Sequence, residues 1–499
     1  MKRKIKKILI ANRGEIAVRI HRSAKELGIV TVAIFSDPDR LSPHVLLCDE
    51  AYPLHGISSQ ETYLNQEKIL SIAKSCRVDA IHPGYGFLSE KSQFAKAVLE
   101  AGFIFIGPTP ETIELLGSKT SARDLLKKKN LPIVPGSTKP ISDFPEAAKM
   151  ANEIGLPIMV KAAGGGGGKG MRRVDKLEDL NNAIERARAE AGKSFSDDRV
   201  YLEKFIVNPK HIEIQILADT HGNVIHLGER ECSIQRRHQK VVEECPSSVV
   251  TSELREKMGR VAVEIAKASG YVNAGTVEFL LDTEKNFYFL EVNTRLQVEH
   301  PVTELVYGLD LVKEQIRIAE GEKLSISQSE IKINGCAIEC RISAEETDNN
   351  FMPSTGEITH YQPSEGPGVR NDSGVRGGTK ITMHYDPMMA KLIVHGKDRK
   401  EAISRMVRAL DEYKINGVKT TIPFCQFVLS HKEFIGGTYN INFTEQFFTT
   451  TKTPLTQDGI ASLSAAYMQN VNGSVSREKK IDAKEISSPS KWKGRERDE

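Results

Sequence analysis

A run of five glycines, residues 164–168, limits the folds that this chain can adopt, because it lies between two segments of strand character. The segment LPIMVKAA precedes the run, and Lys169, Gly170 and MRRV follow it. Five glycines are costly to order, but their N–H groups can wrap around an anion. A flexible linker is disfavoured, because linkers are not set between two strands with a lysine (Lys161, Lys169) at each end. The run predicts a loop that covers phosphate groups.

Two familiar phosphate-binding patterns do not match. The P-loop pattern fails because Ala163 stands where its first glycine belongs and Gly170 replaces the Ser/Thr that would hold Mg²⁺. The stretch Gly84-x-Gly86-x-x-Ser89 lacks the third glycine of the dinucleotide fingerprint. A dehydrogenase is therefore disfavoured, and the glycine run indicates a phosphate loop of another kind.

The chain is long enough, at 499 residues, for roughly three domains. In the first hundred residues, strands at 7–11, 31–35 and 78–81 alternate with helices at 14–27 and 66–74. This rhythm predicts a parallel sheet that delivers the loop HPGYGFLSE at a strand's carboxyl end, where α/β proteins place their sites.

Two further units follow. A second α/β unit is expected from about 132 to about 321, with strands at 157–162 and 211–218, and a linker over 324–335. A third unit of mostly strand character covers 336–396 and closes with a helix over 399–412. The residues after 448 have the composition of a disordered end.

Charge, hydropathy and cysteine usage narrow the class of protein. Lys+Arg number 69 against Asp+Glu 66, with the signs interspersed, so a nucleic-acid partner is not expected. No segment approaches the ~20 apolar residues that cross a bilayer, so no membrane partner is expected. The seven cysteines are scattered and form no C-x-x-C pair, which favours a reducing compartment such as the cytoplasm.

A second constellation lies in GTVEFLLDTEKNFYFLEVNTRLQVEH, residues 275–300, which reads as a hairpin. An even-numbered turn at 282–285 would pair Glu278 with Phe289. The period of a strand then puts four polar residues on one face: Glu278, Glu291, Asn293 and Arg295. Carboxylate and amide oxygens suit Mg²⁺. A solvated polar face is the alternative, but carboxylates among large apolar residues disfavour it. A three-residue turn would separate the two glutamates.

Basic residues flank this hairpin in sequence. ECSIQRRHQKVVEE precedes it with Arg236, Arg237, His238 and Lys240, and Glu299 follows. Cations near carboxylates can hold an anionic substrate, with Glu299 free to act as a base. A basic cluster alone would more often be a surface patch. Together with the glycine loop and the metal face, the pattern indicates ATP chemistry on a small anion.

Seven blocks of the chain, in order, resemble the biotin carboxylase family of the ATP-grasp superfamily: ANRGEIAVRI, IHPGYGFLSE, KAAGGGGGKGMR, ERECSIQRRHQKVVEE, EVNTRLQVEHPVTE, AIECRISAE and YDPMMAKLI. The resemblance covers about residues 5–448. It implies an α/β fold with an N-terminal Rossmann-like pre-ATP-grasp domain at 1–115 and an ATP-grasp domain at 116–330, with a mobile glycine-rich lid at about 134–206. A strand-rich C-terminal biotin carboxylase domain would span 331–448, and a largely disordered polar tail 449–499.

The resemblance also implies roles for particular residues. ATP would bind at Lys119, Lys161, Gly167, Gly168, Glu203, Lys204, Phe205, Ile206, His211, Gln235, His238, Glu278 and Glu291. Magnesium would bind at Glu278, Glu291 and Asn293. Bicarbonate would bind at Lys240, Arg295, Gln297 and Val298, with Glu299 as general base. Biotin would bind near Arg341 and Tyr85, and the catalytic residues would be Lys240, Arg295, Glu299 and Arg341.

The implied activity is ATP- and Mg-dependent carboxylation of biotin by bicarbonate, with manganese as a substitute metal. Since no Met-Lys-Met attachment motif occurs, the biotin is expected on a separate carrier protein, with carboxyltransferase subunits and a homodimer as further expectations. The expected pathway is acetyl-CoA carboxylase, and the alternatives are propionyl-CoA, pyruvate or 2-oxoglutarate carboxylases. Two rival classes are disfavoured: an ATP-grasp ligase making carbamoyl or aminoacyl phosphates, by the segment 295–300 together with Arg341, and a non-catalytic ATP-binding regulatory subunit, because no base or metal ligand is missing.

Overall fold

A computed structural model describes residues 3–137, 139–162, 171–195 and 198–448, without the side chains of 119–120 and 193–195. The glycine run at 164–168 and the predicted tail at 449–499 lie outside these residues. Within the described ranges, every helix is too short or too polar to cross a bilayer.

The N-terminal part forms the predicted parallel sheet. Its strands lie in the order β3 (Glu50–Pro53), β2 (Val30–Phe35), β1 (Lys7–Ile10), β4 (Ala80–His82) and β5 (Ile104–Phe105). Its helices are α1 (Gly14–Glu26), α2 (Pro43–Leu47), α3 (Gln66–Ser75), α4 (Ser92–Glu100) and α5 (Pro110–Gly117).

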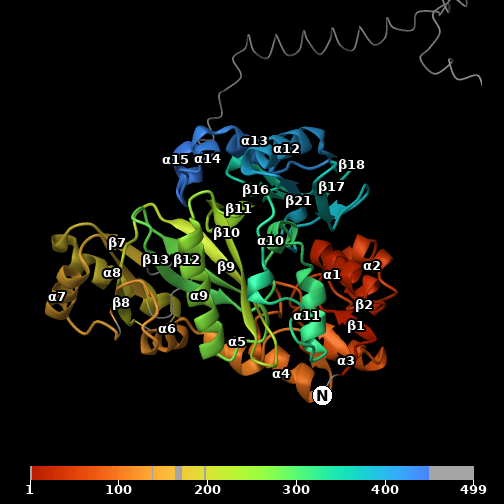
Figure 1. The fold of residues 1–499 in the computed structure, drawn as a ribbon, viewed down its shortest axis with the longest axis horizontal. Helices are drawn as coiled ribbons and strands as arrows, with labels where there is room; N and C mark the ends of the chain where they lie inside the picture. The colour runs from red at the N-terminus through yellow and green to blue at the C-terminus, as the bar shows by residue number, and fades with distance from the viewer. Residues whose placement is uncertain (1–2, 138, 163–170, 196–197, 449–499) are drawn as a thin grey trace, which may run out of the picture. The chain divides into compact units, whose positions relative to one another are not determined.

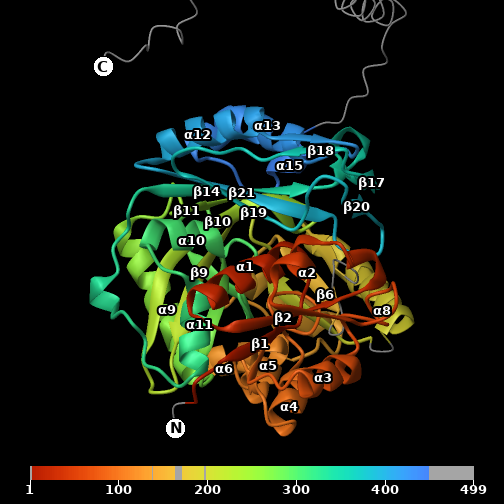
Figure 2. The ribbon, with the colours of Figure 1, turned by 90° about the vertical axis from the view of Figure 1, so that its right-hand side faces the viewer.

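The period of strand β1 explains how helices cover both faces of this sheet. Ile8 and Ile10 pack in one core with α1, whereas Leu9 packs in another core with α3 and α4. Figure 2 shows α1 above the strands and α3 and α4 below them. The strand and helix predictions for the first hundred residues are thereby confirmed, with ends shifted by one or two residues.

A small unit follows helix α6 (Lys119–Lys128) and carries the strands that flank the glycine run. Its elements are α7 (Phe144–Ile154), β6 (Ile158–Ala162), β7 (Met171–Val174), α8 (Leu180–Phe195) and β8 (Val200–Lys204). The three strands pair in the order β7-β6-β8 and share a separate core with α7 and α8. Figure 1 shows the unit at the left.

An eight-stranded antiparallel sheet forms the centre of the described chain. In spatial order it contains β13 (Phe287–Asn293), β12 (Asn273–Leu281), β9 (Lys210–Ala218), β10 (Val224–Arg236), β11 (Gln239–Cys245), β14 (Cys336–Ser343), β21 (Met388–Gly396) and β19 (Val369–Ser373). Helix α9 (Ser252–Ala268) packs on β9 and β10, α11 (Leu311–Ala319) on β12, and α10 (His300–Tyr307) on β14 and β21.

The sheet crosses the expected boundary between the second and third units. Strands β11 and β14 pair directly, with Val242 opposite Cys340 and Glu243 opposite Glu339. Side chains from the two units therefore share one sheet face, and their spacing is set by strand register.

The C-terminal part is rich in strands, as predicted. Its other strands pair as β15 (Glu345–Glu346) with β16 (Met352–Pro353), β17 (Gly356–Glu357) with β20 (Lys380–Ile381), and β18 (His360–Gln362) with β22 (Lys414–Asn416). Helices α12 (Arg399–Glu412), α13 (Ile422–Ser430), α14 (Lys432–Gly436) and α15 (Phe443–Phe447) lie at the top of Figure 1. Short 3-10 turns occur at Asp37–Asp39, Leu177–Asp179, Gln328–Glu330 and Thr347–Asn349.

Candidate active site

A cleft of about 1470 Å³ is lined by the N-terminal part, the small unit, the large sheet and the C-terminal part. The structure brings most of the residues singled out in the sequence to its walls: Tyr85, Lys161, Glu203, Lys204, Phe205, Ile206, His211, Gln235, His238, Lys240, Glu278, Glu291, Asn293, Arg295, Gln297, Val298 and Arg341. Glu299 is fully buried behind this wall. Gly167, Gly168 and the side chain of Lys119 lie outside the described part of the chain.

The hairpin of β12 and β13 carries the candidate metal face, but its predicted register is wrong. Leu281 pairs with Phe287 across a five-residue loop, and Phe279, not Glu278, lies opposite Phe289. An odd-numbered loop alone would put the two glutamates on opposite faces. A β-bulge after Glu278 adds one residue on β13, and Glu278 pairs with Glu291. The bulge thus restores the common face.

Lys240, on β11, is the cation at the centre of the site. Its Nζ lies 2.5 Å from Glu213 Oε2, 2.8 Å from Glu278 Oε1 and 2.7 Å from Glu299 Oε1. Burial lowers the pKa of Lys240, but attraction from these carboxylates outweighs burial and holds that pKa well above its ordinary value. Lys240 is therefore a fixed positive charge at neutral pH.

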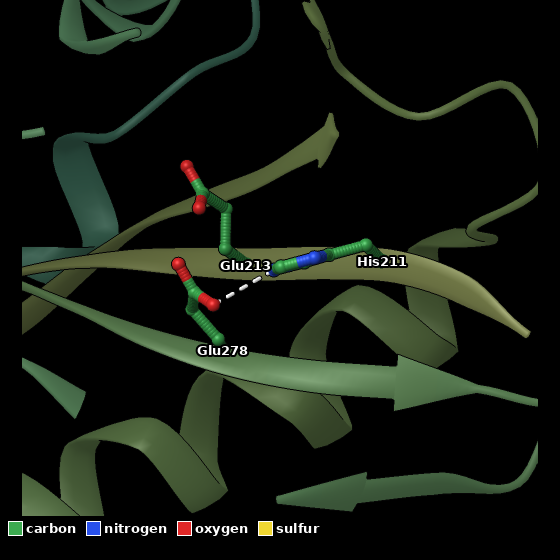
Figure 3. A group of neighbouring side chains, drawn as sticks. All are labelled: His211, Glu213 and Glu278. Atoms are coloured by element: carbon green, nitrogen blue, oxygen red, sulfur yellow. Dashed lines mark ion pairs between the residues drawn. The ribbon is translucent and has the colours of Figure 1, made fainter. Parts of the chain in front are cut away.

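Glu213 was missed by the sequence argument. It lies on β9 beside His211 and across from Glu278, and Figure 3 shows the three side chains together, with His211 Nε2 2.9 Å from Glu278 Oε2. Buried Arg230 pairs with Glu213 and donates to Gln215 Oε1 at 2.7 Å. The signal available was the alternation His211-x-Glu213-x-Gln215, in which the intervening residues and the rest of the strand to Ala218 are apolar.

Arg341, on β14, joins two buried carboxylates. Its Nε lies 2.6 Å from Glu243 Oε1, and its Nη2 lies 3.0 Å from Glu299 Oε2. Burial raises the pKa of Glu299, but Lys240, Arg341 and Arg230 together hold it well below the ordinary range. Burial raises the pKa of Glu243 to about 7 despite Arg341. Glu299 is consequently ionised, the form that accepts a proton.

A third cation of the cleft, Arg295, lies in the segment after β13. Its Nε lies 2.9 Å from Glu90 Oε2, and its two Nη atoms donate to Gln297 Oε1 at 3.1 Å and Asn293 Oδ1 at 3.2 Å. Glu90 was not assigned a role in the sequence, although it belongs to the loop HPGYGFLSE. Lys240, Arg295 and Arg341 all line the cleft, and such a set of cations suits a small anion.

The small unit faces the cleft with a second charged group. Glu203, on β8, pairs with Lys161 of β6 and with Arg123 of α6. Lys204 directs its Nζ to the carbonyls of Gly155 and Leu156 at 2.8 and 3.1 Å. Lys161 and Glu203 thus line the cleft as an ion pair, whereas the Lys204 ammonium is held within the small unit.

The Tyr85 loop closes the N-terminal side of the cleft. Asn12 Nδ2, after β1, donates to the carbonyls of Pro83 and Tyr85 at 2.8 and 2.7 Å. The Tyr85 ring lies 5.8 Å from the Nζ of buried Lys391. Tyr85 and Arg341 therefore reach the same cleft from different domains.

The donor set on the hairpin fits a hard divalent cation. Glu278 and Glu291 are cross-strand partners, and Asn293 Nδ2 lies 2.8 Å from Glu278 Oε1, so the three side chains share one face. All three offer oxygen atoms, the donors that Mg²⁺ and Mn²⁺ take.

Three family models match the chain. Residues 4–113 match "Biotin carboxylase, N-terminal domain", residues 118–327 match "Carbamoyl-phosphate synthase L chain, ATP binding domain", and residues 339–446 match "Biotin carboxylase C-terminal domain".

Relatives and solved structures agree with these matches. "Biotin carboxylase 1" of Bacillus subtilis (strain 168) is 52% identical over 444 residues, which cover 89% of this chain and 99% of that protein. "Biotin carboxylase" of Haemophilus influenzae is 50% identical over 443 residues, covering 89% of this chain and 98% of that protein. The biotin carboxylase domain of Hydrogenobacter thermophilus 2-oxoglutarate carboxylase, solved with MgADP, ADP and bicarbonate, superposes with a TM-score of 0.83 at 48% identity, covering 90% of this chain and 99% of that one.

Proposed function

Because this chain belongs to the biotin carboxylase family of ligases, we propose that it carboxylates biotin on a separate carrier protein, in the first half-reaction of acetyl-CoA carboxylase. The substrates are ATP, bicarbonate and biotin, and Mg²⁺ is the metal, with Mn²⁺ as a substitute. The observation that carries this proposal is the Glu299 carboxylate, which is shared between Lys240 and Arg341 at 2.7 and 3.0 Å.

The first chemical step uses Glu299 as a base. Bicarbonate is held by Lys240, Arg295, Gln297 and the backbone of Val298, and displaces part of the cationic contact that Glu299 makes. Glu299 takes the bicarbonate proton, and the resulting oxyanion attacks the γ-phosphorus of ATP, releasing ADP and forming carboxyphosphate. Lys240 remains charged throughout and offsets the negative charge that gathers there.

The second step uses Arg341. Carboxyphosphate breaks down to CO₂ and phosphate, and the phosphate removes the N1′ proton of biotin. The biotin ureido oxygen then carries negative charge, which Arg341 stabilises by a charge-assisted hydrogen bond, while N1′ attacks CO₂. Tyr85 borders the biotin site. Glu243 and Glu299 hold the Arg341 guanidinium ready for this contact.

The remaining residues bind the nucleotide and the metal. We assign ATP contacts to Lys119, Lys161, Gly167, Gly168, Glu203, Lys204, Phe205, Ile206, His211, Gln235, His238, Glu278 and Glu291. Glu278, Glu291 and Asn293 would hold magnesium, which when bound offsets the charge of the phosphate oxygens. Residues 134–206 would close over the nucleotide and exclude the water that hydrolyses carboxyphosphate.

The domain boundaries, partners and location are also proposals. We place an N-terminal domain at 1–115, an ATP-grasp domain at 116–330 and a C-terminal domain at 331–448, followed by the polar tail. A homodimer, a biotin carrier protein and carboxyltransferase subunits complete the enzyme. A reducing compartment such as the cytoplasm suits the seven cysteines, which are free thiols.

The assignment of acetyl-CoA as the final acceptor is tested by identifying the proteins that co-purify with this chain. The carrier takes carboxybiotin away to a transferase, so the acceptor is chosen on another surface. Purification of the chain from its own cells should bring down a biotinylated carrier and a carboxyltransferase pair that makes malonyl-CoA. Co-purification of a carboxyltransferase for pyruvate, 2-oxoglutarate or propionyl-CoA would contradict the assignment of acetyl-CoA and identify the acceptor instead.

The half-reaction itself is tested with the purified chain. ATP, Mg²⁺, ¹⁴C-bicarbonate and free biotin should yield labelled carboxybiotin and ADP. ATP binding without bicarbonate-dependent ADP formation would favour the non-catalytic subunit. Labelled carbamoyl phosphate formed when ammonia replaces biotin, or ADP formed when an amino acid replaces bicarbonate and biotin, would favour the other ligase class.

A further inference from the structure

Lys391 is a fully buried lysine to which the mechanism above gives no role. It lies on β21, opposite Arg341 of β14 on one side and Asp372 of β19 on the other. Directly paired residues share a sheet face, so these three charged side chains form a row across the C-terminal end of the large sheet. Helices α10 and α1 pack against this part of the sheet.

The Lys391 ammonium joins three parts of the chain. Its Nζ lies 2.8 Å from the carbonyl oxygen of Val298 and 3.2 Å from Glu15 Oε1, at the start of α1. The loop after β19 permits this approach, because a Cβ at Gly374 would lie 2.4 Å from the backbone nitrogen of Glu15. The Lys391 ammonium of β21 therefore contacts both the N-terminal helix α1 and the segment that contains Val298.

The Val298 carbonyl belongs to a segment whose backbone is fixed one carbonyl at a time. Arg295 Nη1 donates to Leu296 O at 3.2 Å, and His300 Nδ1 lies 2.8 Å from Gln297 O. Burial holds the pKa of His300 well below its ordinary value, so the ring is neutral. These two contacts are local, whereas Lys391 reaches Val298 from 93 residues away.

A peptide group is planar, so a bond to one carbonyl orients the next residue. The Gln297 carbonyl shares its plane with the N–H of Val298, and the Val298 carbonyl shares its plane with the N–H of Glu299. His300 therefore sets the Val298 N–H, and Lys391 sets the backbone from which the Glu299 side chain extends.

A purely stabilising role explains this arrangement poorly. A buried ammonium costs several kcal/mol of desolvation, and a buried ion pair is often no more stabilising than apolar packing. Burial raises the pKa of Glu15 to about 7, which means that Lys391 compensates this carboxylate only in part. A neutral donor could satisfy the Val298 carbonyl without a buried charge.

We propose that Lys391 is a positioning residue for the bicarbonate step: by holding the Val298 carbonyl, it places Glu299 against the bicarbonate proton. The inference rests on the proposed function, in which Glu299 is the base. Lys391 does not touch the substrates in this scheme and acts through the backbone.

The test compares steady-state kinetics of wild type and Lys391→Met. We expect kcat for bicarbonate-dependent ADP formation to fall about 100-fold, as for a misplaced catalytic group, with KM for ATP within about twofold of wild type. Arg399→Met is the matched control. Its Nε lies 2.7 Å from buried Glu244, so it also removes a cation from a buried ion pair, but neither residue lines the cleft. This control should lose thermal stability and keep its kcat.

The double variant Lys391→Met/Glu15→Gln guards against misfolding, because it also removes the charge of the carboxylate that Lys391 contacts. It should show the same kcat loss as the single variant with higher thermal stability. Wild-type kcat in a folded Lys391→Met protein, a loss no larger than that of Arg399→Met, or failure of both Lys391 variants to fold would each overturn the positioning role. A wild-type protein without bicarbonate-dependent ADP formation would instead overturn the proposed function, and this inference with it.

Discussion

The Nζ of Lys240 lies 2.7 Å from Oε1 of Glu299, and the same ammonium also contacts the carboxylates of Glu213 and Glu278. The other oxygen of Glu299 accepts from Arg341. A single carboxylate thus connects the cation assigned to bicarbonate with the cation assigned to biotin. Variants at Glu299 and at Arg341 should therefore separate the bicarbonate step from the biotin step.

Glu299→Gln should lower bicarbonate-dependent ATP cleavage by about 100- to 10,000-fold, because an amide cannot accept the bicarbonate proton. Nucleotide affinity, measured by fluorescence titration or calorimetry, should change little, since Glu299 lies behind the cleft wall. Weakened nucleotide binding of similar size would show that Glu299 acts instead by holding Lys240 in place.

Arg341→Ala should impair carboxylation of biotin and spare ATP binding. The variant removes the donor for the ureido oxygen, a contact worth about 10²- to 10³-fold in comparable oxyanion sites. Carboxybiotin formation from ¹⁴C-bicarbonate measures the effect. Arg399→Ala, which breaks a buried ion pair outside the cleft, is the control. An unchanged carboxylation rate in Arg341→Ala would reject the assignment.

Glu291→Gln should raise the Mg²⁺ concentration that gives half-maximal activity about tenfold, because it replaces a charged metal ligand with a neutral one. A Mg²⁺ titration at saturating ATP measures the shift. Glu284→Gln, at an exposed position in the turn of the same hairpin, should leave the titration unchanged. Equal titrations for the two variants would remove Glu291 from the metal site.

His82 should make the protein sensitive to acid. Burial lowers the pKa of His82 from 6.5 to about 3, and its Nδ1 accepts from the Gly84 N–H at 3.1 Å. Below pH 6.5 His82 is protonated in the unfolded chain but stays neutral in the folded chain. The contribution of His82 to the free energy of unfolding is therefore fully present above pH 6.5 and is lost as the pH falls toward 3.

His82→Asn keeps an acceptor for Gly84 and removes the titration. The difference in unfolding free energy between wild type and variant should therefore shift against the wild type by about 2 kcal/mol between pH 6.5 and pH 4.5. Urea denaturation at a series of pH values provides the measurement. Buried His44, whose pKa is also lowered, is present in both proteins and cancels. A difference that is constant with pH would show that His82 titrates normally.

Gly374→Ala should destabilise the protein by about 1–3 kcal/mol through overpacking. Its Cβ would meet backbone atoms of Gly14 and Glu15 at 2.4–2.8 Å, and backbone moves less readily than a side chain. Gly377→Ala, where a Cβ meets nothing within 4 Å, is the matched control. Equal urea midpoints for the two variants would show that α1 does not pack tightly on this loop.

The parallel N-terminal sheet, the hairpin within 275–300 and a set of polar cleft residues that includes Lys240 and Arg341 could be predicted from the amino-acid sequence. These depend on local patterns: the alternation of strand and helix, the two-residue period of a strand, and ordered motif blocks. His211 and Gln235 are 24 residues apart in the chain and are assigned to one site by resemblance to a known family. In the structure, Gln235 Nε2 lies 2.8 Å from His211 Nδ1.

How these residues meet depends on the three-dimensional arrangement of the strands. The sequence pattern predicts an even-numbered turn for the hairpin, whereas the structure has a five-residue loop and a bulge after Glu278 that compensates for it. Glu213 lies outside the motif blocks, and Lys391 lies in the block YDPMMAKLI without an assigned role, because their partners Lys240 and Val298 lie on other strands or segments. Local periodicity sets which face a side chain occupies, whereas strand order and register set what it faces there.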